Sequence, residues 1–203
     1  MIALAASVTD TKQGQAMAKF FGNLNAVLGV GVLLLLAILF GVQGAFESNF
    51  FFRFLHVICA IMWIGHLYYF NFTQIPTMPK VPAELKPGIS KYIAPAALFW
   101  FRWGAAATVA TGLIVAIQAG YAHQAFTLQA PFRTIGIGMW LALIMAANVW
   151  FVIWPAQKKA LGLVEADADT KAKAAVTAMM FSRTNTLLSI AMLYCMISAE
   201  SGF

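Results

Sequence analysis

Two arginines lie inside long apolar runs of this 203-residue chain, Arg102 in the run 93–118 and Arg183 in the run 176–198. A charge inside a bilayer is costly and marks a functional site by default. A buried carboxylate is the usual remedy, but all seven acidic residues lie in loops or at the ends of runs. Two unpaired guanidinium groups indicate an anionic ligand: haem propionates, a lipid phosphate or an anionic substrate. The alternative is that both arginines reach headgroups or bond backbone carbonyls.

Three further polar residues fall at a similar depth in neighbouring runs. At 1.5 Å per residue, Arg102 and Asn185 lie about 13 Å from the near end of their runs, and Arg183 about 10 Å. Asn148 lies about 9 Å in, and His66 about 6 Å. We therefore expect these five residues to form one polar layer that binds a substrate or another anion, with the arginines also available to a cofactor.

His56 stands apart, about one and a half turns from the opposite end of its run, 50–70. Neutral imidazole is a common ligand of haem iron. His56 and His66 are about 15 Å apart along a helix axis, so they cannot clamp one iron together. Met192 lies near the depth of His56 and is a candidate second ligand; the alternatives are another ligand type or an open iron position. Without haem, His56 would be a polar contact between helices.

The elements that must position these residues are membrane-spanning helices. Of all residues, 62% are hydrophobic and 10% charged, against about 45–50% and about 25% in soluble domains. A span needs about 20 apolar residues, and five runs qualify: 25–42, 50–70, 93–118, 135–154 and 176–198. The sequence predicts an all-α, polytopic bundle over 25–203 that follows a cytoplasmic segment, 1–24, with a short helix over 9–23. The net charge of +6 is then loop charge facing the cytoplasm and does not indicate nucleic acid.

Lysine placement predicts the orientation. All nine lysines fall on one side of the five runs, so the N-terminus is expected in the cytoplasm and Phe203 outside. The protein would then sit in a bacterial inner membrane. On the lysine side, Pro76 and Pro155 are expected to lie in loops.

Four strings carry a family resemblance. They are His-Val, Ile-Gly and Tyr-Tyr-Phe-Asn-Phe at 56–57, 64–65 and 68–72; Phe-Arg-Trp-Gly at 101–104; Asn-Val-Trp-Phe-Val-Ile-Trp-Pro at 148–155 with Gln-Lys-Lys at 157–159; and Ser-Arg-Thr-Asn-Thr-Leu-Leu-Ser at 182–189 with Met-Leu at 192–193. Together they resemble the N-terminal membrane domain of the bacterial urate hydroxylases, the membrane-bound cytochrome-c-type urate oxidases. On one helix, His56, Trp63, Gly65 and Tyr68 are also similar to the HemJ-type protoporphyrinogen oxidases, which implies that His56 ligates a b-type haem.

The resemblance implies a membrane-bound oxidoreductase. The chain ends at Phe203 without the Cys-x-x-Cys-His of a cytochrome c domain, so the expected electron acceptor is a separate cytochrome c or a quinone. Electrons would come from a small substrate or a quinol. The competing hypothesis is a cofactor-free accessory subunit of a larger membrane complex, docked through the first span. A transporter is a weaker third reading, because no pair of broken helices or inverted repeat supports it.

Overall fold

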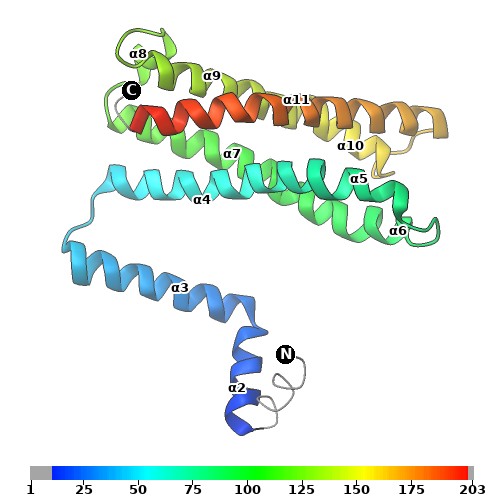
Figure 1. Cartoon of the computed structure of the whole chain (residues 1–203), viewed down its shortest axis with the longest axis horizontal. Helices are drawn as coiled ribbons and strands as arrows, with labels where there is room; N and C mark the ends of the chain where they lie inside the picture. Colours follow the sequence, from blue (N-terminus) through cyan, green and yellow to red (C-terminus); the bar gives the residue numbers. More distant parts are fainter. Residues whose placement is uncertain (1–10, 201–203) are drawn as a thin grey trace. The chain divides into compact units, whose positions relative to one another are not determined.

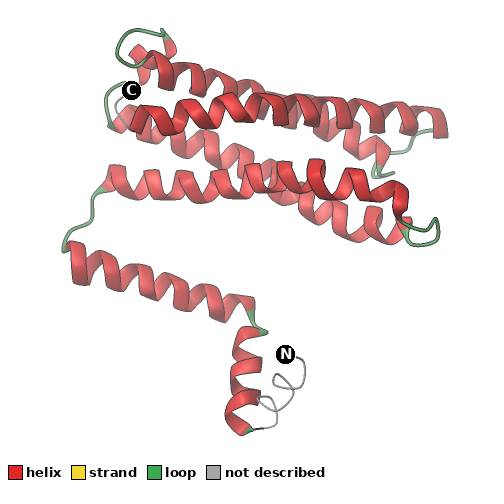
Figure 2. Cartoon of the chain, viewed as in Figure 1, coloured by secondary structure: helices red, strands yellow, loops and turns green. Residues whose placement is uncertain are grey.

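The computed structural model describes residues 11–200, and all regular structure in that part of the chain is helical (Figures 1 and 2). The chain divides into two units, Met1–Ser48 and Asn49–Phe203. Four helical stretches are long and apolar enough to cross a membrane: Leu24–Val42, Ser48–Lys80, Lys86–Gln118 and Arg133–Ala160. These stretches contain the first four predicted spans, and the all-helical prediction is confirmed.

The fifth predicted span, 176–198, lies within α11 (Ala168–Glu200). With 33 residues this helix is long enough to cross a bilayer, but it is not among the four that are also apolar enough. Its middle carries Arg183 and Asn185 in place of apolar residues. The predicted outside position of the C-terminus concerns Phe203, which lies outside the described residues.

In the first unit, the structure describes two α-helices from residue 11 onward. The side chain of Thr11 accepts a hydrogen bond from the amide of Gly14 and begins α2 (Lys12–Phe21), which confirms the short helix predicted there. Next comes α3 (Leu24–Ile38), which Asn23 caps in the same way. The π-helical turn η1 (Leu39–Gln43) continues α3. No residue of α3 is buried within the structure, so its apolar surface is left for lipid or protein.

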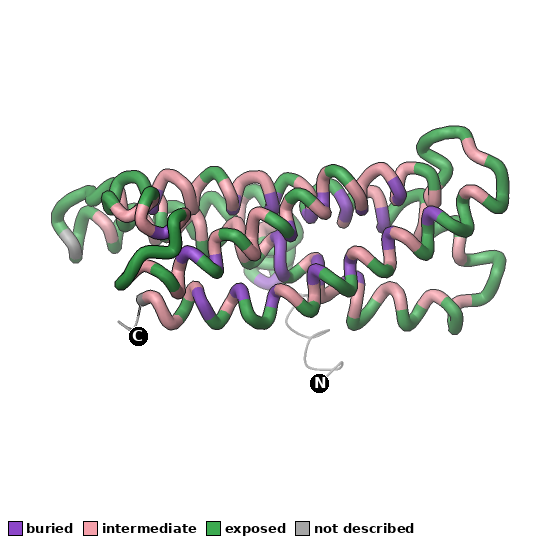
Figure 3. Tube along the Cα trace, turned by 90° about the horizontal axis from the view of Figure 1, so that it is seen from above, coloured by how far each residue is buried: buried purple, intermediate pink, exposed green. Residues whose placement is uncertain are grey.

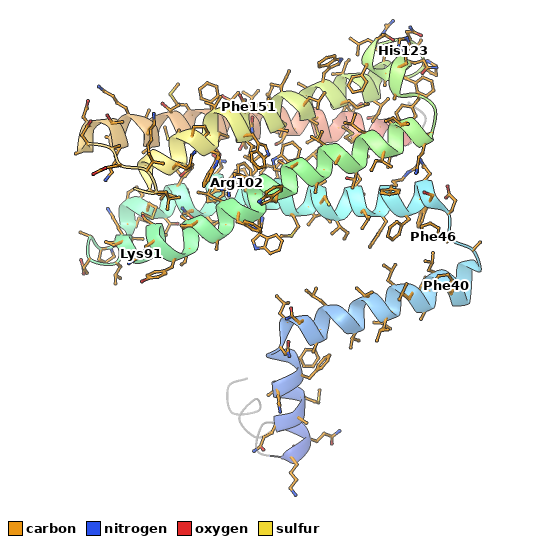
Figure 4. The ribbon with its side chains drawn as sticks, turned by 180° about the vertical axis from the view of Figure 1, so that it is seen from behind. Phe40, Phe46, Lys91, Arg102, His123 and Phe151 are labelled. Atoms are coloured by element: carbon orange, nitrogen blue, oxygen red, sulfur yellow. The ribbon has the colours of Figure 1, made fainter. Side chains whose placement is uncertain are left out.

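In the described part of the second unit, four long helical rods form a bundle, and Figure 1 shows how they lie beside one another. Its first two rods are built on α4 (Ser48–Tyr68) and α7 (Ala94–Gln118). The third runs from α9 (Arg133–Ala147) through the π turn η5 (Asn148–Ile153) into α10 (Trp154–Ala160), and α11 is the fourth. Lys91 and His123 mark opposite ends of the bundle (Figure 4). The end with Lys91 also carries the predicted lysine-rich loops.

Three helices run past prolines where the sequence predicts a span to end or begin. The π turns η2 (Tyr69–Gln74), η4 (Ile89–Ile93) and η5 each end two residues before a proline, namely Pro76, Pro95 and Pro155. A proline lacks the N–H and its ring clashes with the carbonyl four residues earlier, which in each case belongs to the π turn. The wider turn absorbs that clash, so the predictions that put Pro76 and Pro155 in loops are wrong.

A buried seam runs along α11, beside a core cluster whose members come mainly from α4, α7, α9 and η5. The buried residues of the seam recur every three or four positions: Ala174, Ala178, Ser182, Asn185, Ser189, Met192 and Cys195. Figure 3 shows buried positions alternating with exposed ones along the bundle helices. On the other side, α4 and α7 approach closely where a Cβ on Gly104 would lie 3.0 Å from the amide nitrogen of Trp63. These contacts determine which faces of α4, α7 and α11 point into the bundle.

Candidate functional site

A cavity of about 1110 Å³ lies within the bundle, between α4, α7, α9 and α11. His56 and Met192 both line it, and so do Arg53 and Trp63. The volume is slightly above the usual range of small-molecule and cofactor sites, about 300–1,000 Å³. The structure thus brings the two predicted iron ligands to one cavity, although their role as ligands stays a prediction.

The imidazole of His56 is held by α7. Its Nδ1 lies 2.9 Å from the backbone oxygen of Thr108 and 3.3 Å from the hydroxyl oxygen of Thr111. With a proton on Nδ1, the ring donates to the Thr108 carbonyl and leaves the lone pair of Nε2 free. Space for the ring comes from Gly112, where a Cβ would lie 2.7 Å from Cε1 of His56. Metal-binding histidines almost always have such a second-nitrogen partner.

Two further residues that line the cavity carry polarisable or polar groups, Met192 on α11 and Trp63 on α4. Met192 is 5% exposed and brings a thioether, a known axial ligand of haem iron in combination with histidine. Trp63 is fully buried, and its Nε1 has no hydrogen-bond partner in the described structure. An indole N–H can only donate, so this group is available to an acceptor.

Of the predicted polar layer, the structure joins only the two asparagines. Asn148 donates to Oδ1 of Asn185 at 3.0 Å, and Asn185 donates to the backbone oxygen of Met145 at 2.9 Å. Asn185 is fully buried. The pair ties α11 to η5 and α9, and a structural role accounts for all of these bonds.

Arg102 contacts Trp154 of α10 and takes no part in the hydrogen bonds of the two asparagines. Its Cζ lies 3.4 Å from the centre of the Trp154 ring, and Nζ of Lys158 lies 5.6 Å from the same centre. Nη1 of Arg102 is buried without a hydrogen-bond partner among the described residues. Arg102 is labelled in Figure 4.

The last two members of the layer point elsewhere. Arg183 is exposed, while its neighbours in the seam, Ser182 and Asn185, are buried. On α4, Nδ1 of His66 lies 2.6 Å from the backbone oxygen of Met62. His66 lines a separate groove of about 630 Å³ with Trp100. The depth of these five residues in a membrane stays a prediction. The structure does not bring them into one layer of contacts, because it joins only Asn148 and Asn185.

Two polar contacts in the core were not predicted. Tyr68 and Ser189 share a hydrogen bond of 3.0 Å, and Asn71 donates to Ser182 at 2.8 Å. The signal was present in the sequence, because Ser182 and Ser189 lie three before and four after Asn185 and so share its helix face.

No group of three or more His, Cys, Asp or Glu side chains within residues 11–200 could hold a metal ion. Haem iron needs only one or two protein ligands. His56 with its carbonyl partner, the cleared space at Gly112 and the large apolar cavity together fit such a cofactor.

The class defined by these features is an all-helical protein with several helices long and apolar enough to span a membrane. Residues 106–203 match the family described as Urate oxidase N-terminal. The resemblance to the membrane domain of the urate hydroxylases is thereby confirmed over that part of the chain, which includes the strings at 148–159 and 182–193. No curated protein and no solved structure matches the chain.

Proposed function

We propose that this chain is a membrane-embedded redox protein that holds one b-type haem in the cavity beside His56. The observation that carries the proposal is the His56 imidazole, fixed through Nδ1 by the Thr108 carbonyl and facing a cavity of about 1110 Å³. His56 would ligate the iron through Nε2, and Met192 of α11, which lines the same cavity, is the candidate second ligand. When bound, the haem would supply one-electron transfer.

Arg53 is the arginine best placed for a haem carboxylate in this arrangement. It lies one turn before His56 on α4 and lines the same cavity, whereas Arg102 and Arg183 do not. We assign the propionate contact to Arg53 for this reason. Trp63 would donate its buried Nε1–H to an acceptor on the cofactor or substrate. The rest of the lining excludes water and sets the potential of the cofactor.

The proposed membrane arrangement has five spans, with α11 as the fifth and the N-terminus in the cytoplasm of a bacterial cell. It rests on the length of α11 and on the lysines at one end of the bundle. Electrons would pass from a small substrate or a quinol to a separate cytochrome c or quinone. The description of the matched family makes urate the first substrate to test.

The test is a dithionite-reduced minus oxidised spectrum of the detergent-purified protein. We expect the α band of a b-type haem in the wild type and its loss in His56→Ala. His66→Ala is the matched control, because His66 lines the other groove and should leave the band unchanged. A colourless protein, well folded and supplied with haem, would refute the proposal.

A second candidate function is a cofactor-free accessory subunit of a larger membrane complex. The observation that favours it is α3, an apolar helix with no buried residue in its own unit. Removing residues 1–45 separates the two functions. An accessory subunit docked by α3 would lose its partner complex, whereas haem binding by the Asn49–Phe203 unit would persist.

A further inference from the structure

A second site lies around the indole of Trp154, at the contact between α7 and α10. Two cations share this one ring: Arg102, with Cζ 3.4 Å from its centre, and Lys158, with Nζ 5.6 Å from it. None of the three residues lines the cavity of His56 or the groove of His66. The site is therefore separate from the proposed haem.

The aromatic ring alone does not satisfy these cations. A guanidinium carries five N–H donors in one plane, and a ring face attracts the charge but does not replace in-plane acceptors. Within residues 11–200, no hydrogen bond or ion pair reaches the side chain of Arg102 or of Lys158. Nη1 of Arg102 is also buried without a partner. An anion with several oxygens is what this arrangement lacks.

The position of the site along the helices indicates where such an anion comes from. Trp154 lies six residues before Ala160, the end of α10, which is about 9 Å along the axis. Lys158 lies one turn nearer that end, where Lys159 follows. Tryptophans and basic side chains at the end of an apolar helix are typical of the headgroup layer of a membrane.

We propose that Arg102, Trp154 and Lys158 bind a phosphate-type oxyanion, supplied by the headgroup of an anionic phospholipid. The planar guanidinium offers two parallel N–H bonds to phosphate oxygens, and the lysine adds a point charge. Trp154 holds the guanidinium in place by stacking. This inference goes beyond the redox function and does not depend on it.

The experiment compares lipid retention in nanodiscs that contain equal amounts of phosphatidylglycerol and phosphatidylcholine. Bound lipid is identified by native mass spectrometry after release. We expect the wild type to retain phosphatidylglycerol, and Arg102→Gln to retain it about tenfold more weakly, as befits the loss of a charged hydrogen-bonding group. Arg183→Gln is the matched control: it removes the same charge from an exposed position and should retain phosphatidylglycerol normally.

Two further variants keep the outcome interpretable if Arg102→Gln folds poorly. Arg102→Lys retains the charge without the planar fork, and Lys158→Gln lies near the end of α10; both should weaken retention. In phosphatidylcholine-only nanodiscs, inorganic phosphate should raise the melting temperature of the wild type more than that of Lys158→Gln. Phosphate stabilisation without phosphatidylglycerol retention would refute the lipid as the source and leave a soluble anion. Equal phosphatidylglycerol retention by the wild type and all three variants, together with equal phosphate stabilisation of the wild type and Lys158→Gln, would overturn the site itself.

Discussion

Replacing Gly112 by alanine is expected to displace the imidazole of His56. The added Cβ would lie 2.7 Å from Cε1 and 3.0 Å from Nδ1 of that ring. Two carbon atoms prefer a separation of about 3.5–4.0 Å, so the ring must move by about 1 Å. A movement of that size breaks the 2.9 Å contact between Nδ1 and the Thr108 oxygen. The ring would then lose the partner that orients it towards the cavity.

The magnitude follows from three terms. Overpacking costs about 1–3 kcal/mol, and the lost hydrogen bond about 0.5–1.5 kcal/mol. The higher helix propensity of alanine returns about 1 kcal/mol. Gly112→Ala should therefore lower the free energy of unfolding by about 1–3 kcal/mol. Gly65→Ala is the matched control, because a Cβ there meets nothing within 4 Å and only the propensity gain remains.

Two measurements on both variants check this reasoning. Denaturant unfolding in detergent should place Gly112→Ala below Gly65→Ala by about 2–4 kcal/mol. The reduced-minus-oxidised spectrum should lose or shift its haem band in Gly112→Ala, while Gly65→Ala serves as a control for stability alone because Gly65 also lines the cavity. Equal stability and identical spectra would refute the role of Gly112 in seating His56. A stability difference without any haem band in the wild type would support the packing argument and refute the cofactor.

Three further predictions concern packing and capping. A Cβ on Gly136 would lie 2.0 Å from a backbone oxygen of α8 (Ala122–Phe126), so Gly136→Ala should cost about 3 kcal/mol or more, visible as a lower melting temperature. Asn185→Leu leaves the amide of Asn148 without its hydrogen-bond acceptor and should lower the free energy of unfolding by about 1–2 kcal/mol. Adding Asn148→Leu should recover part of that loss in an unfolding titration, and no recovery would contradict the pairing. Hydrogen bonds from the backbone and hydroxyl of Thr170 lower the pKa of Asp167. A lowered native pKa stabilises the protein above the usual aspartate pKa and is lost as the pH falls through the native value, so melting curves of the wild type and Asp167→Asn should differ at neutral pH and converge in acid.

Depth along a helix could be predicted for every candidate residue, but direction could not. The sequence alone predicts that Arg183 and Asn185 lie near one level of α11. The structure buries Asn185 and exposes Arg183. Side chains two positions apart on an α-helix point in directions about 200° apart around its axis. Which face turns inward depends on contacts with Met145 and Asn148, which are far away in sequence.

The helices themselves were determined by the sequence, because a long apolar run in a bilayer must satisfy its backbone hydrogen bonds within itself. The matched family was indicated by a resemblance of strings on successive helices, and not by this physical argument. The sequence did not predict that the helices continue past Pro76 and Pro155. A proline is normally expected to end a helix, and that expectation does not allow for a preceding π turn that makes room for the proline ring. Only the tertiary structure placed Thr108 beside His56 and Trp154 beneath Arg102. Each of those contacts joins residues about 50 positions apart, and such contacts depend on how whole helices pack, which no local pattern of residues encodes.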